Sequence, residues 1–436
     1  MIVDIFFKHP YWAVALVSFF INIPFGYIRE NHPKFSFKWF LWIHASIPAI
    51  VYLRIVLHTS RLFIPVAIFM AIAGQIFGSR YRWKIMTYAE LERLEQIPDL
   101  RIPRKIDSTV NDAQIGVVLL NMGGPENPAQ VRPFLKRLFL DSRIIRIPFS
   151  TVLQPLFAAL IVSLRGKKAE RRYGLIGGGS PILQATLNQV QALAHELTKR
   201  GHNIFVTLCF NYSRPLVDEA IAQLKKERKN YILPLSLYPH YSAATTGSSL
   251  FYLQEEVKRE FPQAIFLPQK SYFLDDGYIA AFVERINEQL KADESLDDFY
   301  LLFSAHGLPL YYLREGDPYP FQIAQTVSKI VGQLGRKDRW AISYQSAVGP
   351  FEWLKPSTDS ILKALAQRGE KKLLVVPVSF VTDHIETLCE IDIEYRALAE
   401  KLGISDFRMS KALECHPAFI KALADCIEAS LEKFLP

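Results

Sequence analysis

The sequence predicts an α/β protein built on parallel sheets and preceded by an α-helical transmembrane segment of about three helices. Two observations predict this. After residue 113, short runs of β-branched and aliphatic residues alternate with amphipathic helical patterns, which is typical of parallel α/β layering. Before residue 84, three apolar stretches approach the length of about 20 residues that a helix needs to cross a bilayer.

The soluble part supplies six strand candidates and eight helix candidates. The strands are expected at residues 115–121, 204–209, 230–236, 299–304, 340–345 and 373–380. The helices are expected at residues 184–199, 215–228, 246–260, 277–292, 320–334, 358–368, 384–401 and 416–434, and a further helix should begin near Asn127. No internal repeat or low-complexity tract interrupts this order.

The apolar stretches of the N-terminal part are residues 11–28, 39–57 and 62–79. Three spans are the favoured interpretation, and one or two interfacial or re-entrant segments are the alternative. A cleaved signal peptide does not fit, because no small-residue cleavage site follows the first stretch. Residues 85–112 are charged and contain Pro98 and Pro103, so they are expected to form a short surface helix and then a linker.

Charge is distributed unevenly along the chain. Of the net charge of +8, the first 84 residues carry +7, from nine basic and two acidic residues, which leaves +1 for the rest. The basic balance therefore gives no support for nucleic-acid binding. The basic residues cluster between the first two stretches and after the third, which predicts that this side of the membrane, and the large soluble part with it, is cytoplasmic.

The most informative stretch is LLVVPVSFVTDHIETLCEIDIEY at residues 373–395. It begins as a buried strand and turns polar at Thr382. If a helix starts near Asp383, then Asp383, Glu386 and Glu390 share one face at the carboxyl end of the strand, where open α/β sheets bind ligands. A solvated helix face with an Asp N-cap is the alternative.

A second polar cluster, SAHGLP at residues 304–309, ends another buried strand. Its histidine, His306, and a carboxylate of the first cluster could face each other across a cleft. Imidazole near neutrality binds metals or accepts a proton, and a carboxylate stabilises the resulting charge. The two clusters therefore predict a site for a divalent metal or for proton transfer.

Long motifs in the same order resemble the signature segments of ferrochelatases, which insert ferrous iron into a porphyrin. They are GVVLLNMGGPENPAQVRPFLKRLFLD at residues 116–141, YGLIGGGSPI at 173–182, LYPHYSAATTGSS at 237–249, SAHGLP at 304–309, YQSAVGPFEWLKPST at 344–358 and SFVTDHIETLCEIDIEY at 379–395. The resemblance covers about residue 113 to the C-terminus and leaves out the N-terminal segment.

This resemblance implies two Rossmann-like chelatase lobes with a cleft between them. The implied lobes are lobe 1 at residues 113–272 together with a C-terminal helix at 412–436, and lobe 2 at 273–411. The apolar stretches and the charged segment after them add a transmembrane module at residues 1–84 and a linker at 85–112. The resemblance also implies that the protein forms protohaem from protoporphyrin IX and Fe²⁺. With the orientation predicted from the basic residues, this reaction is expected at the inner, cytoplasmic membrane, with the catalytic part facing the cytoplasm. Residues 149–165 would form an apolar lip or a core helix rather than a fourth span.

The resemblance also implies site residues. His306 and Glu386 would bind the metal and transfer protons, and Asp383, His384 and Glu390 would extend a polar path to solvent. Met122, Tyr212 and Trp353 would contact the porphyrin ring, while Arg165, Lys168, Tyr173 and Ser180 would recognise its propionates. Asn211 and Arg214 depart from the arginine and histidine that many ferrochelatases carry at these positions.

The four cysteines, Cys209, Cys389, Cys415 and Cys426, have no metal-ligand spacing and are expected to be free thiols. No iron–sulfur cluster and no other tightly bound cofactor are expected, because the closely spaced cysteines of cluster-containing ferrochelatases are absent and Ala243 stands where one ligand would be. Two alternatives remain open: a membrane-tethered porphyrin or haem carrier without chelatase activity, and a chelatase for cobalt or nickel and a different tetrapyrrole.

Overall fold

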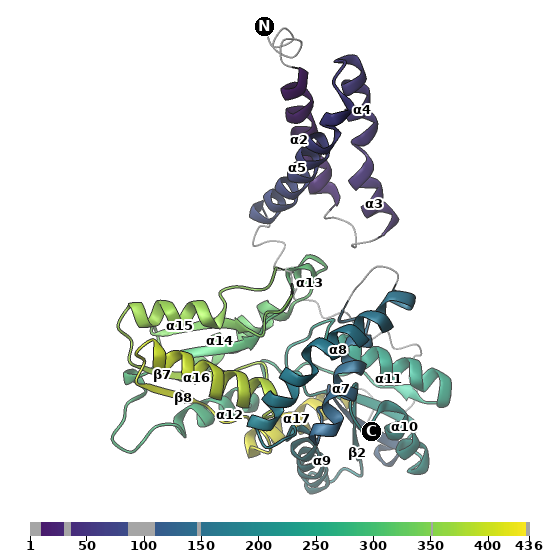
Figure 1. The fold of residues 1–436 in the computed structure, drawn as a ribbon. Coiled ribbons are helices and arrows are strands. Elements are labelled where there is room, and N and C mark those ends of the chain that lie inside the picture. The colour runs from purple at the N-terminus through teal and green to yellow at the C-terminus, as the bar shows by residue number, and fades with distance from the viewer. Residues whose placement is uncertain (1–9, 30–35, 86–109, 146–149, 350–351, 433–436) are drawn as a thin grey trace. The chain divides into compact units, whose positions relative to one another are not determined.

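The computed structural model describes residues 10–29, 36–85, 110–145, 150–349 and 352–432. The chain divides into two compact units, Met1–Arg93 and Leu94–Pro436 (Figure 1). The surface helix and linker predicted at residues 85–112 lie almost entirely outside the described residues.

The first unit is helical. Its elements are α2 (Pro10–Arg29), α3 (Phe37–His44), α4 (Ile47–Val56), the 3-10 helix Arg61–Phe63 and α5 (Ile64–Ile85). Helices α2 and α5 cross very closely, because a Cβ atom at Gly26 would lie 2.2 Å from the carbonyl oxygen of Gln75 and one at Gly74 would lie 2.0 Å from that of Phe19. Only glycine allows the two backbones to approach this far.

Within the described residues, one segment of this unit, Phe37–Val56, is long and apolar enough to cross a membrane. It comprises α3 and α4. The apolar helical segments Pro10–Gly26 and Arg61–Phe77 are shorter. The prediction of three spans is therefore not confirmed by length and composition. The second predicted stretch, moreover, is not one regular helix, since α3 ends at His44 and α4 begins at Ile47.

Several polar side chains are buried inside this helical unit, and many large apolar side chains are exposed on its outside. Asn22, Ser46 and Gln75 are at most 5% exposed, and the amide oxygen of Asn22 accepts hydrogen bonds from Ser46 Oγ (2.8 Å) and Gln75 Nε2 (3.0 Å). Gln75 Nε2 also donates to the carbonyl of Ile43 at 2.9 Å, close to the break between α3 and α4. Large apolar side chains such as Trp12 and Phe69 are exposed. This distribution is the reverse of that in a water-soluble bundle.

The second unit contains two parallel sheets of four strands, ordered β2-β1-β3-β4 and β6-β5-β7-β8. The strands are β1 (Ile115–Asn121), β2 (Phe205–Phe210), β3 (Tyr231–Ser236), β4 (Ile265–Phe266), β5 (Tyr300–His306), β6 (Trp340–Gln345), β7 (Lys372–Pro377) and β8 (Asp406–Met409). The six predicted strands are confirmed to within a few residues. Strands β4 and β8 were missed because they are short edge strands, and β8 carries two charged residues among four.

Helices flank both sheets (Figure 1). Those of lobe 1 are α7 (Pro128–Leu140), α8 (Ser150–Leu175), α9 (Ile182–Lys199), α10 (Val217–Lys226) and α11 (Thr246–Glu260). Those of lobe 2 are α12 (Asp276–Asn287), α13 (Leu310–Arg314), α14 (Tyr319–Gln333), α15 (Thr358–Gln367) and α16 (Arg396–Lys401), and α17 (Pro417–Leu431) ends the described chain. Helix α17 packs against α9 of lobe 1 and α12 of lobe 2.

The two lobes share a hydrophobic core. One cluster of buried side chains includes Leu119 of β1, Phe303 of β5 and Phe419 of α17. Buried polar contacts also join the lobes, since Asp317 accepts hydrogen bonds from Ser242 Oγ and the backbone N–H of Ala243, both at 2.8 Å. The lobes are thus held at a fixed spacing, which lets side chains from both face one site.

The segment after β7 differs from the prediction. The expected α-helix from about Asp383 through residue 401 is instead a π-helix, η5 (Ile385–Tyr395), followed by α16. A π-helix has i→i+5 hydrogen bonds and more residues per turn, so residues four apart share a face more closely than in an α-helix. The apolar/polar pattern could not distinguish the two helix types.

Residues 150–165 of the predicted lip belong to the longer helix α8, which runs on to Leu175 beside α7. Its outward side carries exposed leucines at positions 153, 156, 160 and 164. It is not among the candidate membrane spans of the described residues.

Candidate functional site

A histidine and a glutamate meet at the carboxyl end of the second sheet. His306 is the last residue of β5, and Glu386 is the second residue of the π-helix. His306 Nδ1 lies 2.9 Å from Glu386 Oε2, and the two side chains are 36% and 24% exposed. The fold therefore joins the two predicted clusters into one partly open, charge-bearing pair.

His306 and Glu386 shift each other's pKa values. Burial alone lowers the pKa of His306, but the charge and hydrogen bond of Glu386 outweigh burial and raise it. For Glu386, burial raises the pKa, and the charge and hydrogen bond of His306 reverse this and lower it to about 2. Glu386 is thus ionised near neutrality, and it stabilises the protonated form of His306.

Replacing Glu386 with Gln is expected to lower the pKa of His306. The amide removes the negative charge that raises this pKa and leaves the burial that lowers it. The measurement is a histidine NMR titration of both proteins, with His306→Gln used to assign the signal. His240, whose pKa burial lowers to about 3, serves as a control that should not titrate between pH 5 and 8. An unchanged His306 midpoint would contradict the pairing.

His384 lies beside the pair. Its Nε2 is 3.8 Å from Glu386 Oε2, and its ring centroid is 4.3 Å from that of Phe380. Burial lowers the pKa of His384, against the charges of Glu386 and Asp383. Its Nδ1 is buried and has no hydrogen-bond partner among the described residues. The predicted polar path thus begins with a neutral histidine next to Glu386.

Asp383 does not share the face of Glu386, contrary to the prediction. Because the helix begins at Ile385, Asp383 precedes it, where its carboxylate accepts a hydrogen bond from Thr387 Oγ1 at 2.9 Å. Its backbone N–H donates to Glu414 at 3.2 Å. The contacts described for Asp383 tie the start of the π-helix to the segment before α17 rather than to Glu386.

Glu390 follows Glu386 by four residues on the π-helix, as the prediction requires. It is 8% exposed and accepts hydrogen bonds from the backbone N–H and the hydroxyl of Ser346 at 2.8 and 2.7 Å. The Tyr395 hydroxyl donates to it at 3.2 Å. Burial and the charge of Glu386 raise the pKa of Glu390, which suits a group that takes up and releases protons.

Two tyrosines of lobe 1 lie in the electrostatic field of Glu386. Burial and the charge of Glu386 raise the pKa values of Tyr173 and Tyr238, and a backbone hydrogen bond from Met122 opposes this at Tyr238. Tyr238 is thus coupled both to the Met122 turn of lobe 1 and, through charge, to Glu386 of lobe 2. Sequence reasoning assigned Tyr173 to propionate recognition and missed Tyr238, although Tyr238 stands in a quoted motif.

The glycine-rich loop of lobe 1 packs against the Met122 turn. The Ser180 backbone N–H donates to the carbonyl of Pro125 at 2.7 Å, and a Cβ atom at Gly124 would lie 2.6 Å from that of Ser180. Gly124 is therefore required for this close approach. Arg165 and Lys168, the proposed propionate cations, are exposed on α8.

Arg172, which the sequence analysis did not select, links the lobes. It lies in the last turn of α8, its Nη2 donates to Glu394 Oε2 at 2.9 Å, and its Nε is 2.9 Å from Glu394 Oε1. The same guanidinium approaches Glu390 Oε2 at 3.8 Å. An exposed cation on a helix has no sequence signal that distinguishes such a contact from a solvated face.

Trp353 lies next to the residue that follows His306. A Cβ atom at Gly307 would be 3.2 Å from the Trp353 ring, and the indole N–H donates to the carbonyl of Val348 at 2.9 Å. The ring is half-buried. Trp353 thus packs against the turn that follows His306, and its contact with a porphyrin ring stays a prediction.

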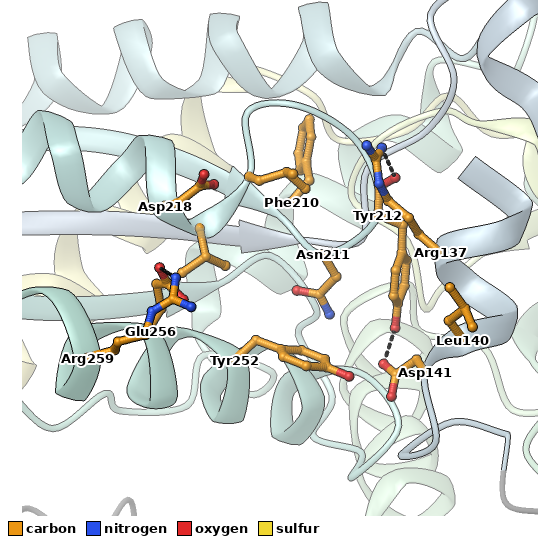
Figure 2. A pocket seen from close by; sticks show the side chains of 12 residues that line it. Arg137, Leu140, Asp141, Phe210, Asn211, Tyr212, Asp218, Tyr252, Glu256 and Arg259 are labelled. Atoms are coloured by element: carbon orange, nitrogen blue, oxygen red, sulfur yellow. Dashed lines mark hydrogen bonds and ion pairs between the residues drawn. The ribbon is translucent and has the colours of Figure 1, made fainter. Parts of the chain in front are cut away.

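Tyr212 lines a separate cavity of about 450 Å³ in lobe 1 (Figure 2). It is 3% exposed, its hydroxyl donates to Asp141 Oδ2 at 2.6 Å, and Ser248 donates to the same oxygen at 3.0 Å. The lining, which includes Asn211, Tyr252 and Arg137, does not contain His306 or Glu386. The Tyr212 phenol is engaged in this polar cluster, so the expected flat contact with a ring is not evident from its surroundings.

No group of three or more His, Cys, Asp and Glu side chains in the described residues is arranged to hold a metal ion. The four cysteines have no disulfide, and three of them are buried. The predicted role of His306 and Glu386 as metal ligands therefore stays a prediction.

The similarity to known proteins lies in the second compact unit, which contains this site. Residues 114–431 match the family model described as ferrochelatase. The ferrochelatase of Synechococcus elongatus is 45% identical over 323 residues, which cover 73% of this chain and 83% of that protein. That of Gloeobacter violaceus is 43% identical over 323 residues and is covered to 98%. Among solved structures, SirB from Bacillus subtilis with Fe³⁺ aligns over 72% of this chain and 95% of its own, with 12% identity and a TM-score of 0.44.

Proposed function

The chain belongs to the ferrochelatase family, and from this premise we propose that His306 and Glu386 form the place where the metal substrate enters the porphyrin and the pyrrole protons leave. The protein is a metal chelatase, a lyase of haem biosynthesis whose substrates are a porphyrin and iron. The observation that carries the residue assignment is the 2.9 Å contact between His306 Nδ1 and Glu386 Oε2 in a partly open site.

The chemistry asks two things of such a pair. Two pyrrole N–H protons must leave while a divalent cation arrives, so the site needs a proton acceptor and negative charge together. His306 in its neutral form accepts a proton or binds the metal, and ionised Glu386 stabilises the positive charge in either case. The ring must bend to expose a nitrogen lone pair, and contacts elsewhere on the macrocycle supply that strain energy.

Protons are proposed to leave along the π-helix. His384 adjoins Glu386, and Glu390 lies four residues further on the same helix, with a pKa raised by burial. Asp383 is left out of this path because its carboxylate is held by Thr387. The route ends near Glu394 and Arg172, where the side chains are 44% and 29% exposed.

The porphyrin is proposed to be protoporphyrin IX, bound between the lobes. Met122 and Trp353 would contact the ring from opposite lobes, and Arg165 and Lys168 would attract the propionates from α8, with Tyr173 and Ser180 nearer the cleft. Exposed cations are suited to this task, because they attract the negatively charged carboxylates and can donate charge-assisted hydrogen bonds to them when the porphyrin binds. Tyr212 is a weaker candidate for ring contact, since Asp141 holds its hydroxyl.

The N-terminal unit is proposed to anchor the enzyme in the cytoplasmic membrane with three spans. Support comes from its reversed polarity, with Asn22, Ser46 and Gln75 hydrogen-bonded inside and aromatic residues such as Trp12 and Phe69 outside. Buried polar pairs between helices are typical of membrane bundles. The basic residues near Arg29 and in the last part of α5 favour the cytoplasm as the location of the catalytic unit.

The test of the overall activity is anaerobic metallation of protoporphyrin IX by the purified full chain, followed by absorbance. Fe²⁺ is expected to be inserted with turnover, and Co²⁺ and Ni²⁺ serve as competing metals. Binding of porphyrin without insertion of any metal above the blank would favour a porphyrin carrier. Faster insertion of Co²⁺ or Ni²⁺ than of Fe²⁺ would reassign the metal but keep the chelatase reaction.

A further inference from the structure

We propose that Ser379 and Tyr319 are positioning residues for the His306–Glu386 pair: their hydroxyl groups fix the backbone of His306 where its neighbouring strand has ended. The proposal rests on the role of that pair in metal insertion stated above. Neither residue touches the His306 imidazole or the Glu386 carboxylate in the described contacts, so both would act through the backbone of His306.

The need for such support follows from the sheet. Strands β5 and β7 pair in parallel as far as Ser304 and Pro377, and the Val378 N–H donates to the Ser304 carbonyl at 3.0 Å. Beyond this point the chain leaves the sheet toward the π-helix. On the opposite side, β6 continues to Gln345 opposite His306, and Gly307 N–H donates to the Gln345 carbonyl at 2.8 Å. The His306 peptide groups on the β7 side therefore have no strand to pair with.

Two side-chain hydroxyls take the place of that strand. Ser379 Oγ accepts the His306 backbone N–H at 2.9 Å, and the Tyr319 hydroxyl donates to the His306 carbonyl at 3.0 Å. Ser379 and Tyr319 are 6% and 7% exposed. In such surroundings an unpaired backbone group is costly, so the two hydroxyls hold His306 at a defined position rather than leave a frayed strand end.

Ser379 also links the two members of the pair. It stands in the short segment that leads from β7 to Glu386, and its neighbour Phe380 has its ring centroid 6.3 Å from that of His306 and 4.3 Å from that of His384. The hydrogen bond from His306 to Ser379 thus ties the end of β5 to the segment that carries Glu386. Because metal insertion depends on placement of the reacting groups, a small shift at this contact should slow the reaction.

The test compares Ser379→Ala with a variant that loses another buried side-chain hydrogen bond in the same sheet. Ser379→Ala is expected to lower kcat for Fe²⁺ insertion roughly tenfold, with an unchanged KM for porphyrin and weaker binding of Co²⁺ in the absence of porphyrin. Ser379→Thr, which keeps a hydroxyl, should restore most of kcat. Tyr319→Phe should also lower kcat. It tests independently whether the hydroxyl groups that bind the His306 backbone position the pair.

The control is Ser343→Ala in β6. Ser343 is fully buried and bonded to Thr358 at 3.0 Å, so its loss removes a comparable hydrogen bond away from His306. It should lower thermal stability and leave kcat near that of the original protein. Wild-type kcat in Ser379→Ala, or an equal fall in Ser343→Ala, would overturn the proposal. Full activity in His306→Ala would instead show that the pair itself was misassigned, and the positioning role would fall with it.

Discussion

Replacing His306 with Ala is expected to lower metal insertion by about 10²–10⁴-fold, and replacing Glu386 with Gln should have an effect of the same order. Each change removes one half of a pair in which His306 Nδ1 lies 2.9 Å from Glu386 Oε2. Without the imidazole the carboxylate loses its 2.9 Å partner and keeps His384, at 3.8 Å, as a nearby acceptor. Without the carboxylate the positive charge on His306 or on the metal loses its hydrogen-bonded counterion. Anaerobic metallation kinetics with Fe²⁺ measure both variants.

Two comparisons make this result specific. The double variant should be little worse than either single variant, because residues that act as a unit have non-additive effects. His202 provides a matched control, since its Nε2 lies 3.1 Å from Glu428 Oε1 in a similar histidine–glutamate contact between the segment after α9 and helix α17. His202→Ala should keep normal turnover. Porphyrin binding measured by fluorescence should survive in all these variants, which separates loss of chemistry from loss of folding.

A residual rate near that of the original protein in either His306→Ala or Glu386→Gln would contradict the assignment. In that event, Tyr238 and Glu390 would be the next groups to replace, because both lie in the electrostatic field of Glu386.

Removal of residues 1–93 is expected to move the enzyme from the membrane fraction to the soluble fraction without loss of kcat. The boundary follows the two compact units, Met1–Arg93 and Leu94–Pro436, and the proposed catalytic pair lies in the second. The full chain should resist extraction with alkaline carbonate, because a spanning helix leaves the bilayer only with detergent. Sedimentation after carbonate treatment, followed by the metallation assay, measures both effects.

Cysteine labelling distinguishes three spans from the alternatives. With three spans and a cytoplasmic catalytic unit, Leu62→Cys lies on the side of the membrane opposite the cytoplasm, and Phe37→Cys lies on the cytoplasmic side. Both side chains are more than 80% exposed. A membrane-impermeant maleimide should label the first in intact cells and the second only after permeabilisation. Labelling of both positions from one side, or release of the full chain by carbonate, would instead indicate interfacial or re-entrant helices.

The sequence predicted the sheets well because buried parallel strands have a strong signal. A run such as LLVVP in β7 is apolar at every position, as both faces of the strand are covered, and the polar residues that follow it mark the ligand edge. The long motifs, in their order along the chain, indicated the ferrochelatase family. The edge strands β4 and β8 carried too few apolar residues to give the same signal.

The sequence singled out the main pair of the proposed site but not the residues proposed to support it. His306 and Glu386 were selected because their residue types carry metal and proton chemistry, whereas Tyr238, Arg172, Ser379 and Tyr319 are distinguished only by their contacts in the fold. The local sequence does not indicate that a hydroxyl will replace a strand partner or that a guanidinium will reach a neighbouring lobe. Asp383 failed for a related reason, because its placement depended on where the helix began.

The sequence by itself thus determined the fold class, the family and the two residues at the centre of the proposed chemistry, since these follow from hydrophobic periodicity and from residue types in long motifs. Tertiary structure alone decided the π-helical geometry after β7, the separation of Tyr212 into its own cavity and the polar interior of the N-terminal unit. Each of these depends on contacts between segments far apart in the chain, as between Asn22 and Gln75 or His306 and Ser379, which local patterns do not encode.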